Sequence, residues 1–113
     1  MKINIAAMAA SADKAGVLLK ALANRHRLMI VCQLIERERP VGELAQMLGL
    51  RDSTVSQHLA LLRKDGLVAA RREGQMIWYS IGRPAARELV AALHRIYCEP
   101  GSKARVARRA QPK

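Results

Sequence analysis

The chain has 113 residues, enough for one hydrophobic core and too few for two. Half of its residues are hydrophobic, which excludes wholesale disorder, and its formal net charge of +11 favours a polyanionic partner, nucleic acid before an anionic membrane surface. One tryptophan, two tyrosines and no phenylalanine argue against a protein that binds single strands by stacking bases on aromatic rings. This composition favours a small helical protein that binds double-stranded DNA.

No stretch of the sequence approaches the ~20 apolar residues of a membrane span, so no membrane association is expected. Residues 1–12 resemble a signal peptide only weakly, because their apolar part is mostly alanine and is interrupted by Asn4. We therefore expect a cytoplasmic protein, in which cysteines remain thiols rather than structural disulfides.

The C-terminal residues 99–113 differ in composition from the rest of the chain. Residues 99–102 read as a stop signal, and beyond them Val106 is the only sizeable apolar residue. We predict a folded domain over residues 1–98, followed by a basic disordered tail. The basic residues of this tail are Lys103, Arg105, Arg108, Arg109 and Lys113.

Two helices are predicted in the N-terminal part of the chain. Residues 12–23 have apolar side chains at helical spacing, and Asn24 is able to end this helix and cap the next one. The second helix is predicted from about residue 25 to residue 37, because Pro40 stops it.

Two shorter helices follow, separated by a tight turn. Residues 41–48 place apolar side chains on one face, and Gly49 is a good residue to end a helix. Asp52 or Ser53 is a suitable N-cap for a helix over residues 53–64. This arrangement is typical of a helix-turn-helix.

The period of the apolar pattern then changes from helical to alternating. Residues 67–72 and 76–81 are predicted strands joined around residues 73–75, and a last helix is predicted from Pro84 to Cys98. The predicted fold is mainly α (α+β): a winged helix-turn-helix with a two-stranded β-hairpin as its wing.

The first turns of the second short helix carry small hydrogen-bonding side chains of the kind that reach base edges in a major groove. Gln57 is able to pair bidentately with adenine, and nearby basic residues are able to contact phosphates. The alternative for each residue is a solvated helix face or a charged turn. The candidate DNA contacts are Arg51, Ser53, Thr54, Ser56, Gln57, His58, Arg63 and Lys64, with Arg71, Arg72 and Gln75 around the hairpin tip.

Three segments together resemble the ArsR/SmtB family of bacterial transcriptional repressors: Leu22–Leu28, Val41–Ala45 and Ser53–Val68, the last of which reads STVSQHLALLRKDGLV. The resemblance covers about residues 15–98. It implies a homodimer in which the flanking first and last helices form the dimer interface. It also implies that the dimer binds a palindromic double-stranded operator and releases it when an inducer changes the shape of the dimer. Carried over by motif, the DNA contacts are Thr54, Ser56, Gln57 and His58, with Arg72 for the wing.

Many members of this family sense metals, but the familiar metal sites are missing here. The segment 41–44 lacks the Cys-x-Cys pair of one site, and the last helix offers only His94 for another. Zinc bound by Cys32, His94 and Cys98 remains an alternative. We predict no metal site and no cofactor.

The two cysteines suggest a different inducer. By composition alone, Cys32 and Cys98 would be reduced thiols that pack as small hydrophobic groups. However, the segments Val31–Leu34 and Ile96–Cys98 resemble the dithiol branch of the family, of the BigR, SqrR and YgaV type and the related HlyU type. That resemblance implies a redox or persulfide sensor, which releases its operator when reactive sulfur species or another oxidant oxidise or bridge Cys32 and Cys98.

Two other function classes remain to be weighed. An enzyme is not expected, because no catalytic triad or pair of acid–base carboxylates stands out and so small a helical domain leaves little room for a pocket. The other alternative is a winged helix that packs DNA or contacts proteins, with structural thiols. Such a packing protein would lose nearly all preference for a specific duplex.

Overall fold

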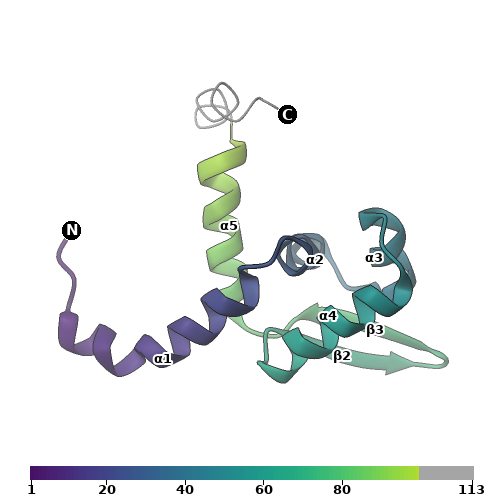
Figure 1. Ribbon diagram of the computed structural model, residues 1–113, viewed down its shortest axis with the longest axis horizontal. Coiled ribbons are helices and arrows are strands. Elements are labelled where there is room, and N and C mark those ends of the chain that lie inside the picture. The colour runs from purple at the N-terminus through teal and green to yellow at the C-terminus, as the bar shows by residue number, and fades with distance from the viewer. Residues whose placement is uncertain (100–113) are drawn as a thin grey trace.

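The computed structural model describes residues 1–99, and in this part the chain forms five helices and three strands (Figure 1). The predicted tail lies outside the described residues except for Glu99. The elements are α1 (Ile5–Leu22), α2 (Arg25–Glu36), β1 (Arg39–Pro40), α3 (Val41–Leu48), α4 (Asp52–Lys64), β2 (Val68–Glu73), β3 (Met76–Ile81) and α5 (Pro84–Cys98). This order confirms the predicted winged helix-turn-helix.

Local capping explains most helix ends. The Asn24 side chain accepts a hydrogen bond from the Arg27 N–H at 3.1 Å and so begins α2, as predicted. Gly49 ends α3 with a φ of 68°, a left-handed conformation that costs glycine little. The prediction that the first helix begins at residue 12 is wrong. The helix begins at Ile5, because the Asn4 side chain accepts a hydrogen bond from the Ala7 N–H at 3.0 Å and the alanine-rich segment that follows has high helix propensity.

The start of α4 also differs from the prediction. Arg51 occupies the N-cap position without a side-chain hydrogen bond, and Asp52 and Ser53 already lie inside the helix. The Asp52 carboxylate in the first turn instead interacts favourably with the positive end of the helix dipole.

The sheet has three strands rather than the two expected, in the order β1-β3-β2. The hairpin strands β2 and β3 pair as predicted, with Ala70 opposite Tyr79. The additional strand β1 places Arg39 beside Tyr79 and Pro40 beside Trp78. Proline is tolerated here because β1 lies at the edge of the sheet.

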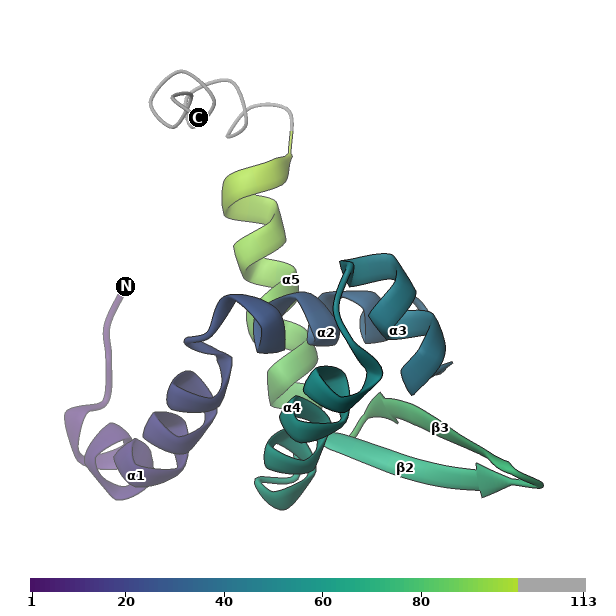
Figure 2. The same cartoon turned by 45° about the vertical axis from the view of Figure 1, so that its right-hand side comes forward.

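Helix α2 lies at the centre of the molecule and contacts α1, α3, α4, α5 and β3. Its side chains Ile30, Val31 and Leu34 are almost fully buried. Figures 1 and 2 show that the N-terminal half of α1 and the C-terminal half of α5 extend away from this body. Large apolar side chains on these two projecting segments are exposed: Ile5, Met8, Ile96 and Tyr97.

No helix within residues 1–99 combines the length and the apolar character needed to cross a membrane.

Candidate nucleic-acid interface and thiol pair

The helix α4 has one buried face and one polar face. Val55, Leu59 and Leu62 are fully buried against the core, which fixes the helix in place. The opposite face carries most of the predicted contact residues. Ser53, Ser56 and Gln57 are exposed near the start of the helix, Thr54 is half-buried, Arg63 and Lys64 are exposed near its end, and Arg51 is exposed just before it.

A hollow of about 430 Å³ lies between α4 and the sheet. It brings Ser56 of α4 together with Arg63, Lys64 and the Tyr79 side chain of β3. A hydroxyl, a phenol and two cations form a set of donors suited to a phosphate oxygen. Tyr79 was not among the predicted contacts, because its position beside α4 depends on how the hairpin packs.

A second hollow of about 430 Å³ lies between α3 and the hairpin. Its lining includes Gly42 of α3, Ser56 of α4 and Gln75 of the hairpin turn. The fold therefore places the start of α4 and the hairpin turn on one continuous surface.

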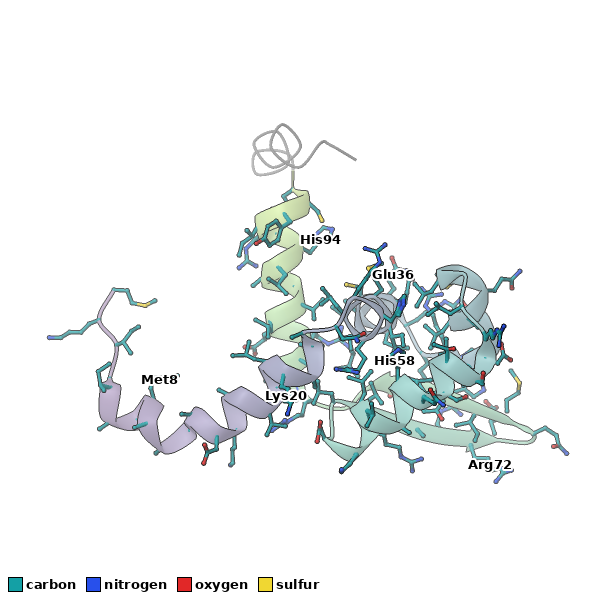
Figure 3. All side chains as sticks on the ribbon, viewed as in Figure 1. Met8, Lys20, Glu36, His58, Arg72 and His94 are labelled. Carbon is teal, nitrogen blue, oxygen red and sulfur yellow. The ribbon has the colours of Figure 1, made fainter. Side chains whose placement is uncertain are left out.

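The two arginines of the wing have different surroundings. The Arg71 guanidinium pairs with Glu38 at 2.8 Å and with Glu73 at 3.1 Å, and it lies 5.9 Å from the centre of the Trp78 ring. The hydrogen bond from Arg71 holds the pKa of the Glu38 carboxyl below its ordinary value. Arg72 remains exposed (Figure 3), and within residues 1–99 its side chain donates only to the Gly74 carbonyl, at 3.3 Å. The side chain of Arg72 is thus the freer of the two to reach DNA.

The side chain of His58 is placed differently from its neighbours Ser56 and Gln57. It is half-buried, and its ring centre lies 5.7 Å from that of His26 on α2. Burial is the largest cause that lowers the pKa of His58, followed by the charges of Arg27 and His26. This position differs from the outward orientation that the sequence suggested for a DNA-contacting histidine.

The two thiols lie on different elements that pack together. Cys32 is half-buried on α2, and Cys98 is the exposed last residue of α5. Burial raises the pKa of the Cys32 thiol, and the nearby Cys98 thiolate raises it further. Helices α2 and α5 pack against each other, which places these two residues in the same part of the fold.

A pocket of about 370 Å³ opens between α2 and α5 beside Cys32. Ile35 and Val90 form part of its apolar wall, while Glu36 and His94, labelled in Figure 3, belong to its polar side. The Arg87 side chain donates to the Ile35 carbonyl at 3.1 Å and fastens α5 to α2 nearby. A small reagent therefore has access to the Cys32 side of the thiol pair.

His94 shares this pocket with Cys32, as the zinc alternative would require. Within residues 1–99, however, no group of three or more histidine, cysteine, aspartate or glutamate side chains is arranged to hold a metal ion.

An ion cluster that the sequence did not reveal joins α2 to the helix-turn-helix. Arg39 is only 4% exposed, and it donates to the Gln33 carbonyl at 3.0 Å, to Glu36 at 2.6 Å and to Glu43 at 2.5 Å. Arg37 also pairs with Glu43. The cluster connects the C-terminal end of α2 with α3. No local pattern predicts it, because arginines outside motifs usually lie at the surface.

Comparison with known proteins identifies the family. Residues 24–70 match the model of the bacterial regulatory protein, arsR family. The transcriptional activator HlyU of Vibrio cholerae serotype O1 is 45% identical over 97 residues, which is 86% of this chain and 90% of that protein. The chain belongs to the ArsR family. It is therefore a DNA-binding transcriptional regulator, and its relatives are regulators rather than enzymes, as the sequence led us to expect.

Solved structures of other ArsR-family proteins share the fold. The transcriptional repressor BigR of Xylella fastidiosa superposes with a TM-score of 0.81 at 40% identity, covering 87% of this chain and all of BigR (100%). The winged helix-turn-helix DNA-binding domain Mb0332 of Mycobacterium bovis, described as homodimeric, has a TM-score of 0.71 at 38% identity, covering 78% of this chain and 82% of that one.

Proposed function

We propose that this ArsR-family protein is a cytoplasmic homodimeric repressor that binds palindromic operator DNA and releases it when reactive sulfur species bridge Cys32 and Cys98. The observation that carries the proposal is the pocket between α2 and α5, which is lined both by Cys32 and by Glu99, the residue after Cys98. Helix α2 also packs against α3 and α4. A bond between the thiols therefore acts on the helix that supports the helix-turn-helix.

The DNA contacts follow the exposed surface of α4 and the wing. Base edges are contacted by the short side chains at the start of α4, and phosphates by the basic residues at its two ends. Arg72 and Gln75 contact DNA from the wing, whereas Arg71 mainly holds the wing in place through Glu38. The proposed base-contacting residues are Ser53, Thr54, Ser56 and Gln57, and the proposed phosphate-contacting residues are Arg51, Arg63 and Lys64.

The homodimer is supported by the exposed apolar side chains on the projecting parts of α1 and α5. Large apolar side chains that are exposed together, as Ile96 and Tyr97 are on α5, are typical of an interface. The similar domain Mb0332 is described as homodimeric. A dimer presents two recognition helices to half-sites about one duplex turn apart, which a palindromic operator supplies.

The proposed chemistry begins at Cys98, because its thiol is exposed whereas burial keeps the Cys32 thiol more protonated. The Cys98 thiolate attacks the terminal sulfur of a persulfide RSSH, and the S–S bond breaks to give Cys98–SSH and the thiolate RS⁻. The Cys32 thiol loses its proton to solvent and attacks Sγ of Cys98, which displaces HS⁻ and leaves a disulfide. The persulfide is the oxidant, since its outer sulfur leaves reduced as HS⁻ and the two cysteines are oxidised.

A gel-shift titration tests this proposal. The reduced protein is titrated against a duplex that it selects from a random-sequence pool and against a scrambled duplex, with and without glutathione persulfide. We expect the wild type to release the selected duplex, and Cys32→Ser and Cys98→Ser each to stay bound at the dose that releases the wild type. Dithiothreitol should restore binding by the treated wild type.

Several outcomes contradict the proposal. Release of both serine variants at the wild-type dose would show that the thiol bridge is not the switch. Release by zinc, reversed by a chelator and lost in Cys32→Ser, would identify a metal-responsive regulator. Equal binding to the selected and scrambled duplexes would identify a DNA-packing protein.

A further inference from the structure

The contact between His58 and His26 joins the recognition helix to the central helix α2. The ring centres are 5.7 Å apart and the ring planes are inclined by 51°. The Nδ1 atom of His58 is buried and, among the described residues, has no hydrogen-bond partner. This ring nitrogen faces the protein and is not available to a base or a phosphate. Together with the contact to His26, it indicates a packing role at the α2–α4 contact.

The surroundings of His58 favour the neutral ring. Burial is the largest cause that holds the pKa of His58 below its ordinary value, and the charges of Arg27 and His26 on α2 lower this pKa further. Arg27 is fixed by its hydrogen bond to the Ala21 carbonyl at 2.7 Å. In the adjoining hollow, Lys20 from α1 and Asp65 after α4 are the other charged groups beside Arg27.

We propose that His58 is a positioning residue: its neutral ring packs on His26 and holds α4 in place on α2. This position of α4 directs Ser56 and Gln57 toward the DNA. Protonation of His58 weakens the contact with α2 and therefore weakens specific DNA binding. The inference rests on the proposed DNA interface of α4, but it is independent of the thiol chemistry.

The two possible roles of His58 predict pH effects of opposite sign. A histidine at the DNA surface would gain attraction to phosphates on protonation, so acid would strengthen binding. A half-buried ring that packs on His26 beside Arg27 is instead disfavoured when charged. Because its pKa in the folded protein lies below the ordinary value of 6.5, the seating of α4 is fully favourable above about pH 6.5 and is lost as the pH falls below it.

The test measures fluorescence anisotropy of the full-length reduced protein on the selected duplex and on the scrambled duplex at constant salt. Acidification from about pH 7.5 to about pH 5.5, which brackets the ordinary histidine pKa, should weaken specific binding by the wild type about threefold or more. Binding to the scrambled duplex should weaken less, because phosphate contacts tolerate a small reorientation of α4. His58→Gln, which cannot be protonated, should not lose affinity in acid.

His94→Gln is the matched control, because His94 is exposed on α5 and is not among the groups that act on His58 (Figure 3). This variant should keep the acid-dependent loss of the wild type. Acid-strengthened binding that His58→Gln abolishes would overturn the proposal, as would an unchanged acid loss in His58→Gln. If the protein selects no duplex at all, the proposed DNA interface and this inference both fail, whereas binding with the wrong pH dependence overturns only the role of His58.

A second measurement covers the case in which His58→Gln does not fold. The ring proton signals of His58 in the wild type are followed by NMR against pH, with and without the selected duplex. We expect titration below pH 6.5 and little direct shift on DNA binding. Titration at or above the ordinary value, together with a large shift on DNA binding, would show that His58 contacts the DNA itself.

Discussion

Arg39 shows how one buried charge is able to organise several elements. Its guanidinium is almost completely removed from solvent, yet its donors are satisfied by one carbonyl of α2 and by the carboxylates of Glu36 and Glu43. A buried charge is tolerated only when it is paired and hydrogen-bonded, so this cluster constrains where α2 ends and α3 begins. Arg39 is also one of the two residues of β1, so this edge strand begins at the ion cluster.

Arg39→Ala should destabilise the protein by about 2–3 kcal/mol, because it leaves the Gln33 carbonyl and the Glu43 carboxylate without their buried donor. Urea unfolding, followed by circular dichroism, measures the change. The matched control is Arg37→Ala, which removes the more exposed partner of Glu43 and should cost less than about 1 kcal/mol. Equal losses in the two variants would show that the burial of Arg39 adds nothing to the stability of the cluster.

At the scale of the element, the wing is attached to the body through a charged contact rather than through the core alone. Arg71 on β2 pairs with Glu38, which precedes β1, and lies against Trp78 on β3. The Arg71 guanidinium therefore links β2 to β3 and to the residue that precedes β1, which limits the motion of the hairpin.

The fluorescence of Trp78, the only tryptophan of the chain, reports on this attachment. Because the Glu38 pKa is lowered by Arg71, the pair persists below pH 4.5 and is lost only on further acidification, so the wild type should show a Trp78 transition in that range. Glu38→Gln should shift the spectrum at neutral pH and remove this transition. Glu73→Gln, which removes the more exposed partner, should change the spectrum less. An acid transition of the same size in Glu38→Gln would show that Glu38 does not hold Arg71.

Element ends were predictable where the signal is local, as at Asn24, Gly49 and Pro84, because capping and turn chemistry act within a few residues. The additional strand β1 was not predictable, since Arg39 and Tyr79 pair only after α3, α4 and the hairpin have packed together. The same reason explains His58. A helical pattern places it near the outer face, but only the packing of α4 on α2 turns its ring toward His26.

At the scale of the whole molecule, the projecting segments of α1 and α5 expose apolar side chains to solvent in the single chain. The ends of α1 and α5 carry large apolar side chains with no cover within residues 1–99, whereas the polar face of α4 is backed by a buried core. In the proposed dimer the exposed apolar surface is buried, and the position of α5 then relates the proposed DNA-contacting faces of the two α4 helices to each other. In the proposed switch, a bond between Cys98 on α5 and Cys32 on α2 acts on the geometry of the dimer rather than on the fold of one protomer.

Replacing Ile96 by glutamate tests this arrangement. Ile96 is 52% exposed on α5, and a carboxylate there should disfavour burial against a partner while leaving the core of the protomer intact. We expect Ile96→Glu to sediment as a monomer at concentrations at which the wild type is a dimer. It should also lose most of its specific DNA affinity, because two linked half-site contacts become independent. Met47→Glu, a similarly exposed site (44%) on α3, is the matched control and should remain dimeric. The α5 interface is contradicted if Ile96→Glu stays dimeric, or if the wild type itself sediments as a monomer at high concentration. Either result also removes the route by which a thiol bridge would change the spacing of the two α4 helices in the dimer.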